Sequence, residues 1–127
     1  MEKQFDQEIQ YLEEKDADYI VGYMHEMFVA NSKDFESPIR YYVGIAKDMD
    51  QNYSRHKRDF DGMDFNYTAI CKCKDADIAA EVEQRLGDRN FYIGEENIGG
   101  KGGTEESVYV YMFRRPDRDL RNESIVR

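Results

Sequence analysis

The sequence predicts a single α+β domain, in which one small mixed or antiparallel sheet is flanked by helices. Segments with an apolar residue at every second position are interspersed with segments of helical periodicity, which is typical of this fold class. The chain has 127 residues, 40% of them hydrophobic, so it can bury a core of its own. No repeat, low-complexity segment or linker interrupts it, so we expect one domain over residues 1–127.

The first elements are predicted to be a helix and a strand. Phe5, Ile9 and Leu12 recur at helical spacing, which predicts a short, acidic, amphipathic helix over residues 3–15. The next segment, DADYIVGYMHEMFVA (16–30), is rich in aromatic and β-branched residues, which favours an extended strand.

The middle of the chain is predicted to continue as strand, helix and strand. After a polar loop that ends at Pro38, residues 39–45 have the composition of a second strand, which could form a hairpin with the first. Asp48 can cap the following helix. The apolar face of that helix has steps of four, three and four residues: Met49, Tyr53, His56 and Phe60. Alternating residues over 65–73 predict a strand with one buried face.

The last part is predicted to add a helix and two strands. Asp75 can cap a helix that ends at Gly87, and a short strand follows at 91–94. Residues 107–113, SVYVYMF, are apolar on both faces and therefore predict a central strand. We expect an acidic N-terminal helix (1–18), a core (19–113) and an arginine-rich tail (114–127).

The net charge of −9 is unevenly distributed. Residues 1–36 hold ten acidic and three basic residues, whereas residues 37–72 carry a net charge of +1 and residues 73–127 one of −3. A negative field repels nucleic acid at long range, so any phosphate contact would depend on local basic clusters. There are two such clusters, and ordinary solvated surface is the alternative interpretation of both: Arg55, Lys57 and Arg58, and Arg114, Arg115, Arg118 and Arg121.

The composition also predicts a cytoplasmic protein. No run of 18 apolar residues is present, and the acidic N-terminus lacks the apolar segment of a secretory signal. Cys71 and Cys73 do not suggest a disulfide framework, and without two further ligands at suitable spacing they do not suggest a zinc site. We therefore expect no membrane association.

The segment YYVGIAKDMDQNYSRHKRDF (41–60) resembles the second half of the GIY-YIG nuclease signature. In that family a strand ending in Tyr-Ile-Gly leads through a short turn into a helix with an arginine and often a histidine. Here Tyr42-Val43-Gly44 matches Tyr-Ile-Gly, AKDMD matches the turn, and His56 falls where many homing nucleases have a histidine. The resemblance covers residues 19–113 and implies a GIY-YIG-like architecture.

The resemblance also implies roles for residues outside this segment. The strand IVGYM would supply a second tyrosine, Tyr23, and the helix AAEVEQRL would supply the metal-binding glutamate, with Glu83 ahead of Glu81. Asn97 resembles the family asparagine near the end of the domain. In an active enzyme Glu83 would bind Mg²⁺, and Tyr23 or Tyr42 would orient or deprotonate the attacking water with help from His56.

Each of these residues also has a purely structural interpretation. Glu83 could be a solvent-facing helical acid. Tyr23 and Tyr42 could pack in the core with their hydroxyl groups at the surface. His56 could simply extend the apolar face of its helix, and we expect His25 to be structural.

One position departs from the family pattern. The catalytic arginine of the family lies eight residues after the glycine of Tyr-Ile-Gly, and counting from Gly44 gives Asn52. Losing a preorganised cation costs several kcal/mol in the transition state, or about a thousandfold in rate. Arg55, one helical turn further on, could substitute with a different reach. We therefore expect a degenerate member of the family, with weak catalysis or none.

The predicted function is binding of a nucleotide or nucleic-acid phosphate group. The side chains expected to hold phosphate are Arg55, Arg58, Lys101, Arg114 and Arg115. Such a protein could serve a phage or mobile element by sequestering a nucleotide signal or blocking a host defence enzyme. The 13% aromatic content and the apolar strand faces would also allow a homo-oligomer.

Two alternatives remain open from the sequence. The first is an active, Mg²⁺-dependent endonuclease that uses Glu83 and Arg55. The second is an acidic nucleic-acid mimic, in which residues 1–36 would block a DNA-binding protein partner. Only the first requires a cofactor.

Overall fold

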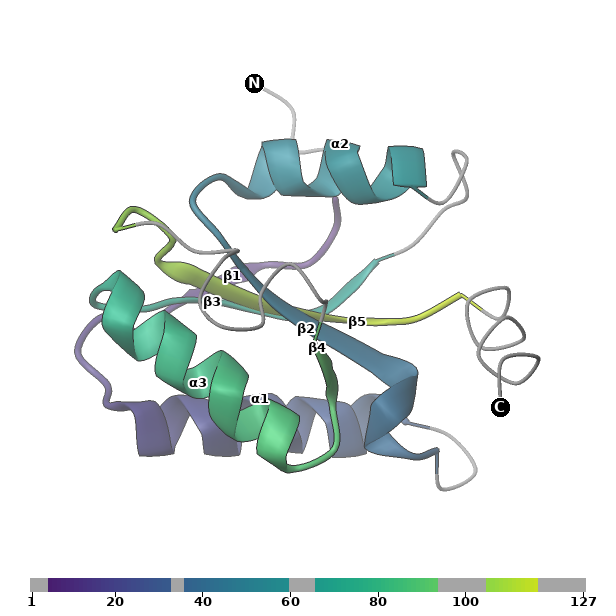
Figure 1. The fold of residues 1–127 in the computed structure, drawn as a ribbon, viewed down its shortest axis with the longest axis horizontal. Helices are drawn as coiled ribbons and strands as arrows, with labels where there is room; N and C mark the ends of the chain where they lie inside the picture. The colour runs from purple at the N-terminus through teal and green to yellow at the C-terminus, as the bar shows by residue number, and fades with distance from the viewer. Residues whose placement is uncertain (1–4, 33–35, 60–65, 94–104, 117–127) are drawn as a thin grey trace.

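The computed structural model describes residues 5–32, 36–59, 66–93 and 105–116. In chain order these residues form β1 (Ile9–Tyr11), α1 (Ala17–Asn31), a 3₁₀ turn (Pro38–Arg40), β2 (Tyr41–Ala46), α2 (Met49–Asp59), β3 (Tyr67–Lys72), α3 (Ala76–Asp88), β4 (Tyr92–Ile93) and β5 (Tyr109–Arg114). Figure 1 shows these elements as a sheet between helices. None of the described helices is both long and apolar enough to cross a bilayer.

The strands form one mixed, five-stranded sheet in the order β1-β3-β5-β2-β4. Strand β1 runs parallel to β3, and β4 runs parallel to β2, while β5 is antiparallel to both of its neighbours. This arrangement confirms the predicted α+β class and the predicted central position of the last strand. In the β2–β5 ladder Ala46 pairs with Tyr109 and Tyr41 pairs with Arg114, so the end of β2 lies beside the start of β5.

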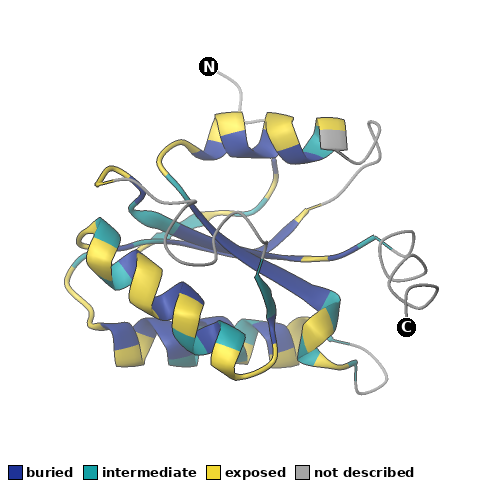
Figure 2. Ribbon diagram, viewed as in Figure 1, coloured by how far each residue is buried: buried dark blue, intermediate teal, exposed yellow. Residues whose placement is uncertain are grey.

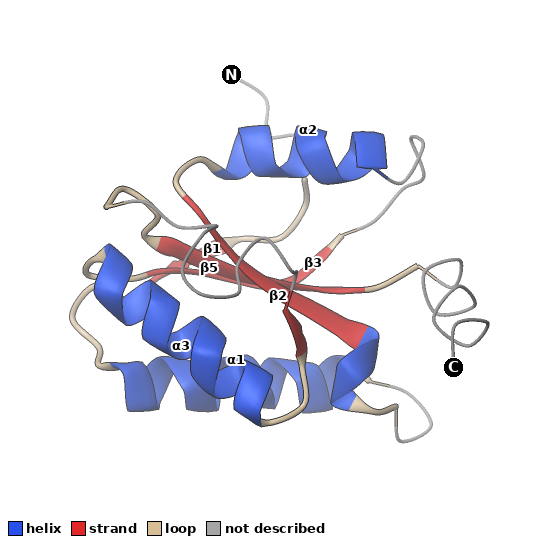
Figure 3. Ribbon diagram, in the orientation of Figure 1, coloured by secondary structure: helices blue, strands red, loops and turns tan. Residues whose placement is uncertain are grey.

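The helices cover both faces of the sheet (Figure 3). Helices α1 and α3 lie together on one face, and α2 lies on the other. The core beneath α1 and α3 is mainly aliphatic, with Ile20, Met24, Val82 and Leu86 fully buried. The core beneath α2 is mainly aromatic and consists of Phe5, Tyr42, Met49, Tyr53, Tyr67, Ile70, Tyr111 and Phe113. The burial colouring in Figure 2 follows these layers, with most of the sheet buried and the outer faces of the helices exposed.

The predicted strand over residues 16–30 is wrong, because this segment forms α1. The Asp16 side chain caps the helix by accepting a hydrogen bond of 2.9 Å from the Tyr19 amide. The buried side chains recur at helical spacing: Ala17, Ile20, Val21, Met24 and Phe28. Packing of this stripe against α3 and β3 outweighs the intrinsic β preference of the aromatic and β-branched residues.

The predicted N-terminal helix over residues 3–15 is wrong as well. Residues Ile9–Tyr11 form the edge strand β1, with Ile9 opposite Ile70 of β3. Phe5 is buried beneath α2, where its ring lies 5.2 Å from that of Tyr67. The expected hairpin between residues 16–30 and β2 is therefore absent, and the antiparallel partner of β2 is β5.

The other predicted elements are confirmed within the described residues, with one difference in burial. Asp48 caps α2 by accepting hydrogen bonds from the amides of Asp50 (2.9 Å) and Gln51 (3.1 Å). Asp75 caps α3 through the Ile78 amide at 2.9 Å. Strand β3 is buried on both faces rather than one, because helices cover both sides of the sheet.

Candidate functional site

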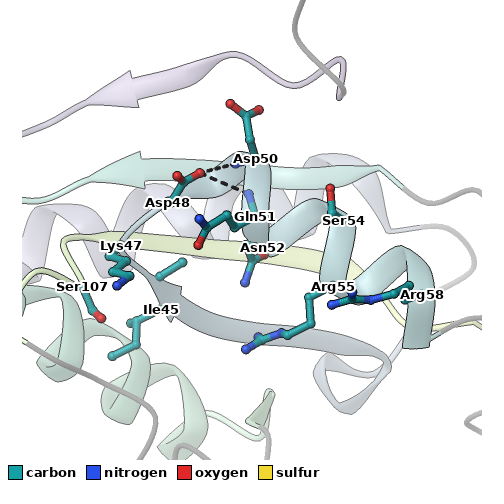
Figure 4. Close-up of a pocket in the computed structure, with 11 residues that line it drawn as sticks. Ile45, Lys47, Asp48, Asp50, Gln51, Asn52, Ser54, Arg55, Arg58 and Ser107 are labelled. Atoms are coloured by element: carbon teal, nitrogen blue, oxygen red, sulfur yellow. Dashed lines mark hydrogen bonds between the residues drawn. The ribbon is translucent and has the colours of Figure 1, made fainter.

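A cleft of about 600 Å³ opens at the carboxyl end of β2 (Figure 4). Its lining residues are Ile45, Ala46, Lys47, Asp48, Asp50, Gln51, Asn52, Ser54, Arg55, Arg58 and Ser107. All but Ser107 come from the continuous segment in which β2 turns into α2. Ser107 joins them because it precedes β5, whose first residues lie beside the last residues of β2.

Three cations face this cleft. Within the described residues Lys47, Arg55 and Arg58 form no ion pair, and their side chains are exposed. Four other basic residues of the described chain instead form salt bridges with acidic side chains: Arg40, Lys72, Arg85 and Arg114. The cleft is thus a local basic region on a protein whose net charge is −9.

The start of α2 contributes acidic groups to the same cleft. Asp48 and Asp50 line it, and the Asp48 carboxylate already accepts hydrogen bonds from the first free amides of the helix. The usual anion site at a helix N-terminus is therefore occupied by the protein's own carboxylate. An anionic ligand would bind at the other end, where Arg55 and Arg58 lie (Figure 4).

A buried polar network lies between α2 and the sheet. The Tyr67 hydroxyl donates to Asn52 Oδ1 at 2.8 Å, and His56 Nε2 is hydrogen-bonded to the Tyr111 hydroxyl at 2.8 Å. Asn52 and His56 are only 5% and 4% exposed. Asn52, where the resemblance implies an arginine, lines the cleft, but its buried amide also holds tyrosine hydroxyl groups in place.

The Tyr111 hydroxyl is the centre of this network. Burial raises the pKa of Tyr111 to about 12, and the negative charge of Glu83 adds to the increase. Hydrogen bonds from Asn52 and Tyr42 and the positive charge of Arg55 act in the opposite direction on the same pKa.

Gly44 allows the Tyr111 side chain to occupy this position. A Cβ atom at Gly44 would collide with the Tyr111 hydroxyl and would lie 2.6 Å from its Cζ. The Tyr42 ring stacks on Phe113 at 4.9 Å and on Tyr111 at 6.0 Å. Gly44 therefore makes room for a tyrosine of the neighbouring strand.

The structure places three of the predicted catalytic residues on the α2 face of the sheet. Tyr42 and His56 pack directly around Tyr111, and Arg55 lines the cleft. Glu83 lies on α3, which covers the other face of the sheet. Tyr23 is not among these three either, because it lies half-buried on α1 and packs against the aliphatic core on the far face of the sheet. Asn97 lies outside the described residues.

The predicted phosphate-binding residues are divided between two places. Arg55 and Arg58 line the cleft. Arg114 is at the opposite end of the β2–β5 ladder, where its Nε donates to Glu36 at 2.8 Å. Arg115 is 3% exposed, donates to the Ile39 carbonyl at 3.0 Å and lies over the Tyr92 ring. Lys101 lies outside the described residues.

The resemblance implies that Glu83 would bind the metal ion. Its side chain is 5% exposed, so it is not a solvent-facing helical acid. Among the described residues no group of three or more His, Cys, Asp or Glu side chains is arranged to hold a metal ion. A Mg²⁺ ion at Glu83 would therefore depend on water and ligand phosphate oxygens for its remaining coordination, a mode that is common for this ion.

Sequence reasoning missed Tyr111, Lys47 and the role of Asn52. Asn52 lies three residues after Met49 and four before His56, so helical periodicity alone could have placed it on the buried face of α2. Tyr111 has no local signal, because its importance depends on β5 pairing with β2 across more than 60 residues of chain.

Comparisons with protein-family models, curated proteins and solved structures found no match to this chain.

Proposed function

We propose that this protein binds a phosphate group of a nucleotide or nucleic acid in the α2 cleft, with little or no cleavage. The observation that carries this proposal is the convergence of Lys47, Arg55 and Arg58, which form no ion pairs in the described chain, on one cleft. Arg55 and Arg58 are three residues apart on a helix, so their guanidinium groups can reach one ligand. Guanidinium groups bind phosphate oxygens in a bidentate manner.

The same proposal describes the domain as GIY-YIG-like. Tyr42-Val43-Gly44 lies on β2 and is followed by the turn and α2, as the resemblance implies. Tyr111 supports the proposal by supplying, from the antiparallel neighbour of β2, the second tyrosine that the sequence assigned to Tyr23. The antiparallel partner of β2 is then β5, which follows β2 in the chain, whereas the resemblance placed the strand with the second tyrosine before β2.

The burial of Asn52 supports binding over efficient catalysis. Its side chain is engaged with Tyr67 and Tyr111 and carries no charge that could stabilise a transition state. Arg55 provides a cation one turn later, but from the exposed rim of the cleft. An exposed, unsupported guanidinium can attract a phosphate, but it lacks the preorganisation on which catalysis depends.

The experiment that tests binding combines thermal shift with product analysis. Purified protein is heated with nucleotides or short oligonucleotides, with and without EDTA, and the ligand is then examined for cleavage. A ligand at 100 times its dissociation constant stabilises the folded state by about 2.7 kcal/mol. We expect such stabilisation with intact ligand in EDTA, and at least tenfold weaker binding for Arg55→Ala.

Arg89→Ala is the matched control, because Arg89 is an exposed arginine at the end of α3, away from the cleft. This substitution removes one positive charge, as Arg55→Ala does, but outside the cleft. The Arg89→Ala variant should therefore bind the ligand as the wild type does. Equal loss of binding in both variants, or no stabilisation by any phosphate ligand, would contradict the proposal.

A second candidate is a metal-dependent phosphodiesterase. It is favoured by the burial of the Glu83 carboxylate, which is only 5% exposed and so is not an ordinary solvent-facing helical acid. Glu83 would hold Mg²⁺, which would stabilise the charge that develops on the leaving oxygen. Metal-dependent cleavage of plasmid DNA that is lost in Glu83→Gln, but retained in the exposed helix variant Glu81→Gln, would establish this function. Intact DNA with the wild-type protein would exclude it for this substrate.

The acidic-mimic alternative receives less support. Among the N-terminal acids, Glu13 pairs with Lys72, Asp18 with Arg85 and Glu36 with Arg114. These ion pairs reduce the negative charge that residues 1–36 would offer to a basic partner.

A further inference from the structure

We propose that the ligand of the α2 cleft is a free nucleotide, with its phosphates at one end, and not a strand of nucleic acid. This inference rests on the proposed phosphate-binding function and narrows its ligand class. It follows from the distribution of charge along the cleft. Both arginines lie at one end, while both carboxylates of the lining lie at the start of α2 (Figure 4).

The arginine end fits a phosphate group. Arg55 and Arg58 contribute two positive charges, and no acidic residue between them lines the cleft. Their side chains are exposed and form no ion pair in the described chain, so a ligand would not have to displace an internal carboxylate. A compact group with two or more negative charges would gain most from this pair.

The other end fits the uncharged part of a nucleotide. It contains Asp48 and Asp50, opposed only by Lys47, together with the amide of Gln51 and the apolar side chain of Ile45. Carboxylates accept hydrogen bonds from sugar hydroxyl groups and base amino groups. The apolar wall formed by Ile45 and Ala46 can contact the flat face of a base or sugar.

A strand of nucleic acid matches this distribution poorly. Its phosphates recur along its whole length, so a strand along α2 would bring a phosphate near Asp48 and Asp50. The helix from Asp48 to Arg58 spans only about 15 Å, which leaves no room to avoid them. Each further phosphate would also be repelled by the net charge of −9, whereas a free nucleotide presents only one anionic group.

The cleft has a suitable size for one nucleotide. A volume of about 600 Å³ is within the range of pockets that enclose small ligands. Strand-binding proteins instead have extended basic grooves with several aromatic side chains for stacking. Among the described residues no aromatic side chain lines this cleft, because the tyrosines beneath α2 are buried in the sheet-facing core.

The test compares ligands by titration calorimetry at 0.15 M ionic strength, a condition under which screening is close to physiological. The probes are the four ribonucleoside 5′-monophosphates and single-stranded 12-residue oligonucleotides without terminal phosphates. We expect at least one monophosphate to bind ten times more tightly than any oligonucleotide. The variant Asp50→Lys removes the acidic barrier and one hydrogen-bond acceptor for the sugar or base, so we expect it to lower the ratio of monophosphate affinity to oligonucleotide affinity at least tenfold.

Asp77→Lys is the matched control. Asp77 is the second residue of α3, as Asp50 is of α2, and both are exposed, but α3 lies on the other face of the sheet. The Asp77→Lys variant makes the same change in net charge as Asp50→Lys. The ratio of monophosphate affinity to oligonucleotide affinity should therefore stay as in the wild type. Oligonucleotides that bind more tightly than monophosphates, and lose binding in Arg55→Ala, would overturn this inference while leaving the phosphate-binding function intact. Failure of all probes to bind would overturn both.

Discussion

At the scale of single residues, Gly44 shows how one missing side chain organises the site. The Tyr111 hydroxyl occupies the space that a Cβ atom would need, within a fully buried region. We expect Gly44→Ala to lower the free energy of unfolding by about 1–3 kcal/mol, the usual cost of overpacking a core. Urea denaturation followed by circular dichroism would measure it.

Gly22→Ala provides the control for this substitution. Gly22 lies within α1, and a Cβ atom there would meet nothing within 4 Å. Because alanine has the higher helix propensity, this variant should be more stable by about 0.5–1 kcal/mol. If both substitutions changed stability in the same direction, the close approach of Tyr111 to Gly44 would not be the determining interaction.

Asn52 illustrates what can and cannot be predicted from sequence at this scale. Counting from Gly44 placed Asn52 where the resemblance implies a catalytic arginine, and helical periodicity could have placed it on the buried face of α2. Neither pattern could reveal the hydrogen bond from Tyr67, because that bond joins α2 to β3. An arginine introduced there would carry its charge towards an aromatic core, so it would be tolerated only if the surrounding tyrosines changed as well.

At the scale of elements, α2 and α3 were predicted from their caps and apolar faces, but α1 was not. Helices α2 and α3 each begin after an aspartate whose carboxylate accepts backbone hydrogen bonds. Helix α1 also has such a cap in Asp16, but its many aromatic and β-branched residues suggested a strand. The apolar stripe that packs on α3 decides between these two signals, and it depends on tertiary contacts that the sequence does not display.

Two substitutions of Asp48 distinguish the capping hydrogen bonds of its side chain from its negative charge. Asp48→Ala removes both, and we expect it to lower the free energy of unfolding by about 1 kcal/mol. Asp48→Asn keeps a side-chain oxygen that can accept from the amides of Asp50 and Gln51, so the loss should stay below about 0.5 kcal/mol. Urea denaturation of both variants checks this, and equal losses would mean that the negative charge matters more than the capping hydrogen bonds.

At the scale of the whole molecule, the α+β class and the central strand could be predicted, but the strand order could not. Strand β5 was identified by its apolar residues on both faces. Its pairing with β2 and β3 creates the site, since it brings Tyr111 over Gly44 and Ser107 beside the end of β2. No local sequence pattern encodes the pairing of distant segments. The part of the site within residues 41–60 could therefore be predicted, whereas Tyr111 and Ser107 could not.

The many buried phenol and thiol groups give the whole molecule a predictable response to alkaline pH. Burial raises the pKa of Tyr41 and Tyr111 from 10.0 to about 12, and that of Cys73 from 9.0 to about 12. Burial also raises the pKa of Tyr67 and Cys71. In the unfolded chain these groups lose their protons at lower pH than in the folded protein. The folded state therefore binds more protons above about pH 9, and its stability decreases as pH rises.

We expect full stability below about pH 9 and a continuous decrease in the melting temperature between pH 9 and pH 12. Thermal unfolding at constant ionic strength over this range measures the decrease. Tyr111→Phe removes one of the buried phenols, so its melting temperature should fall less steeply above pH 10. Tyr11→Phe, which alters a side chain that is 64% exposed, should retain the wild-type slope. A melting temperature that stays constant up to pH 11 would mean that water reaches the hydroxyl and thiol groups beneath the helices, and would contradict the packed aromatic layer under α2.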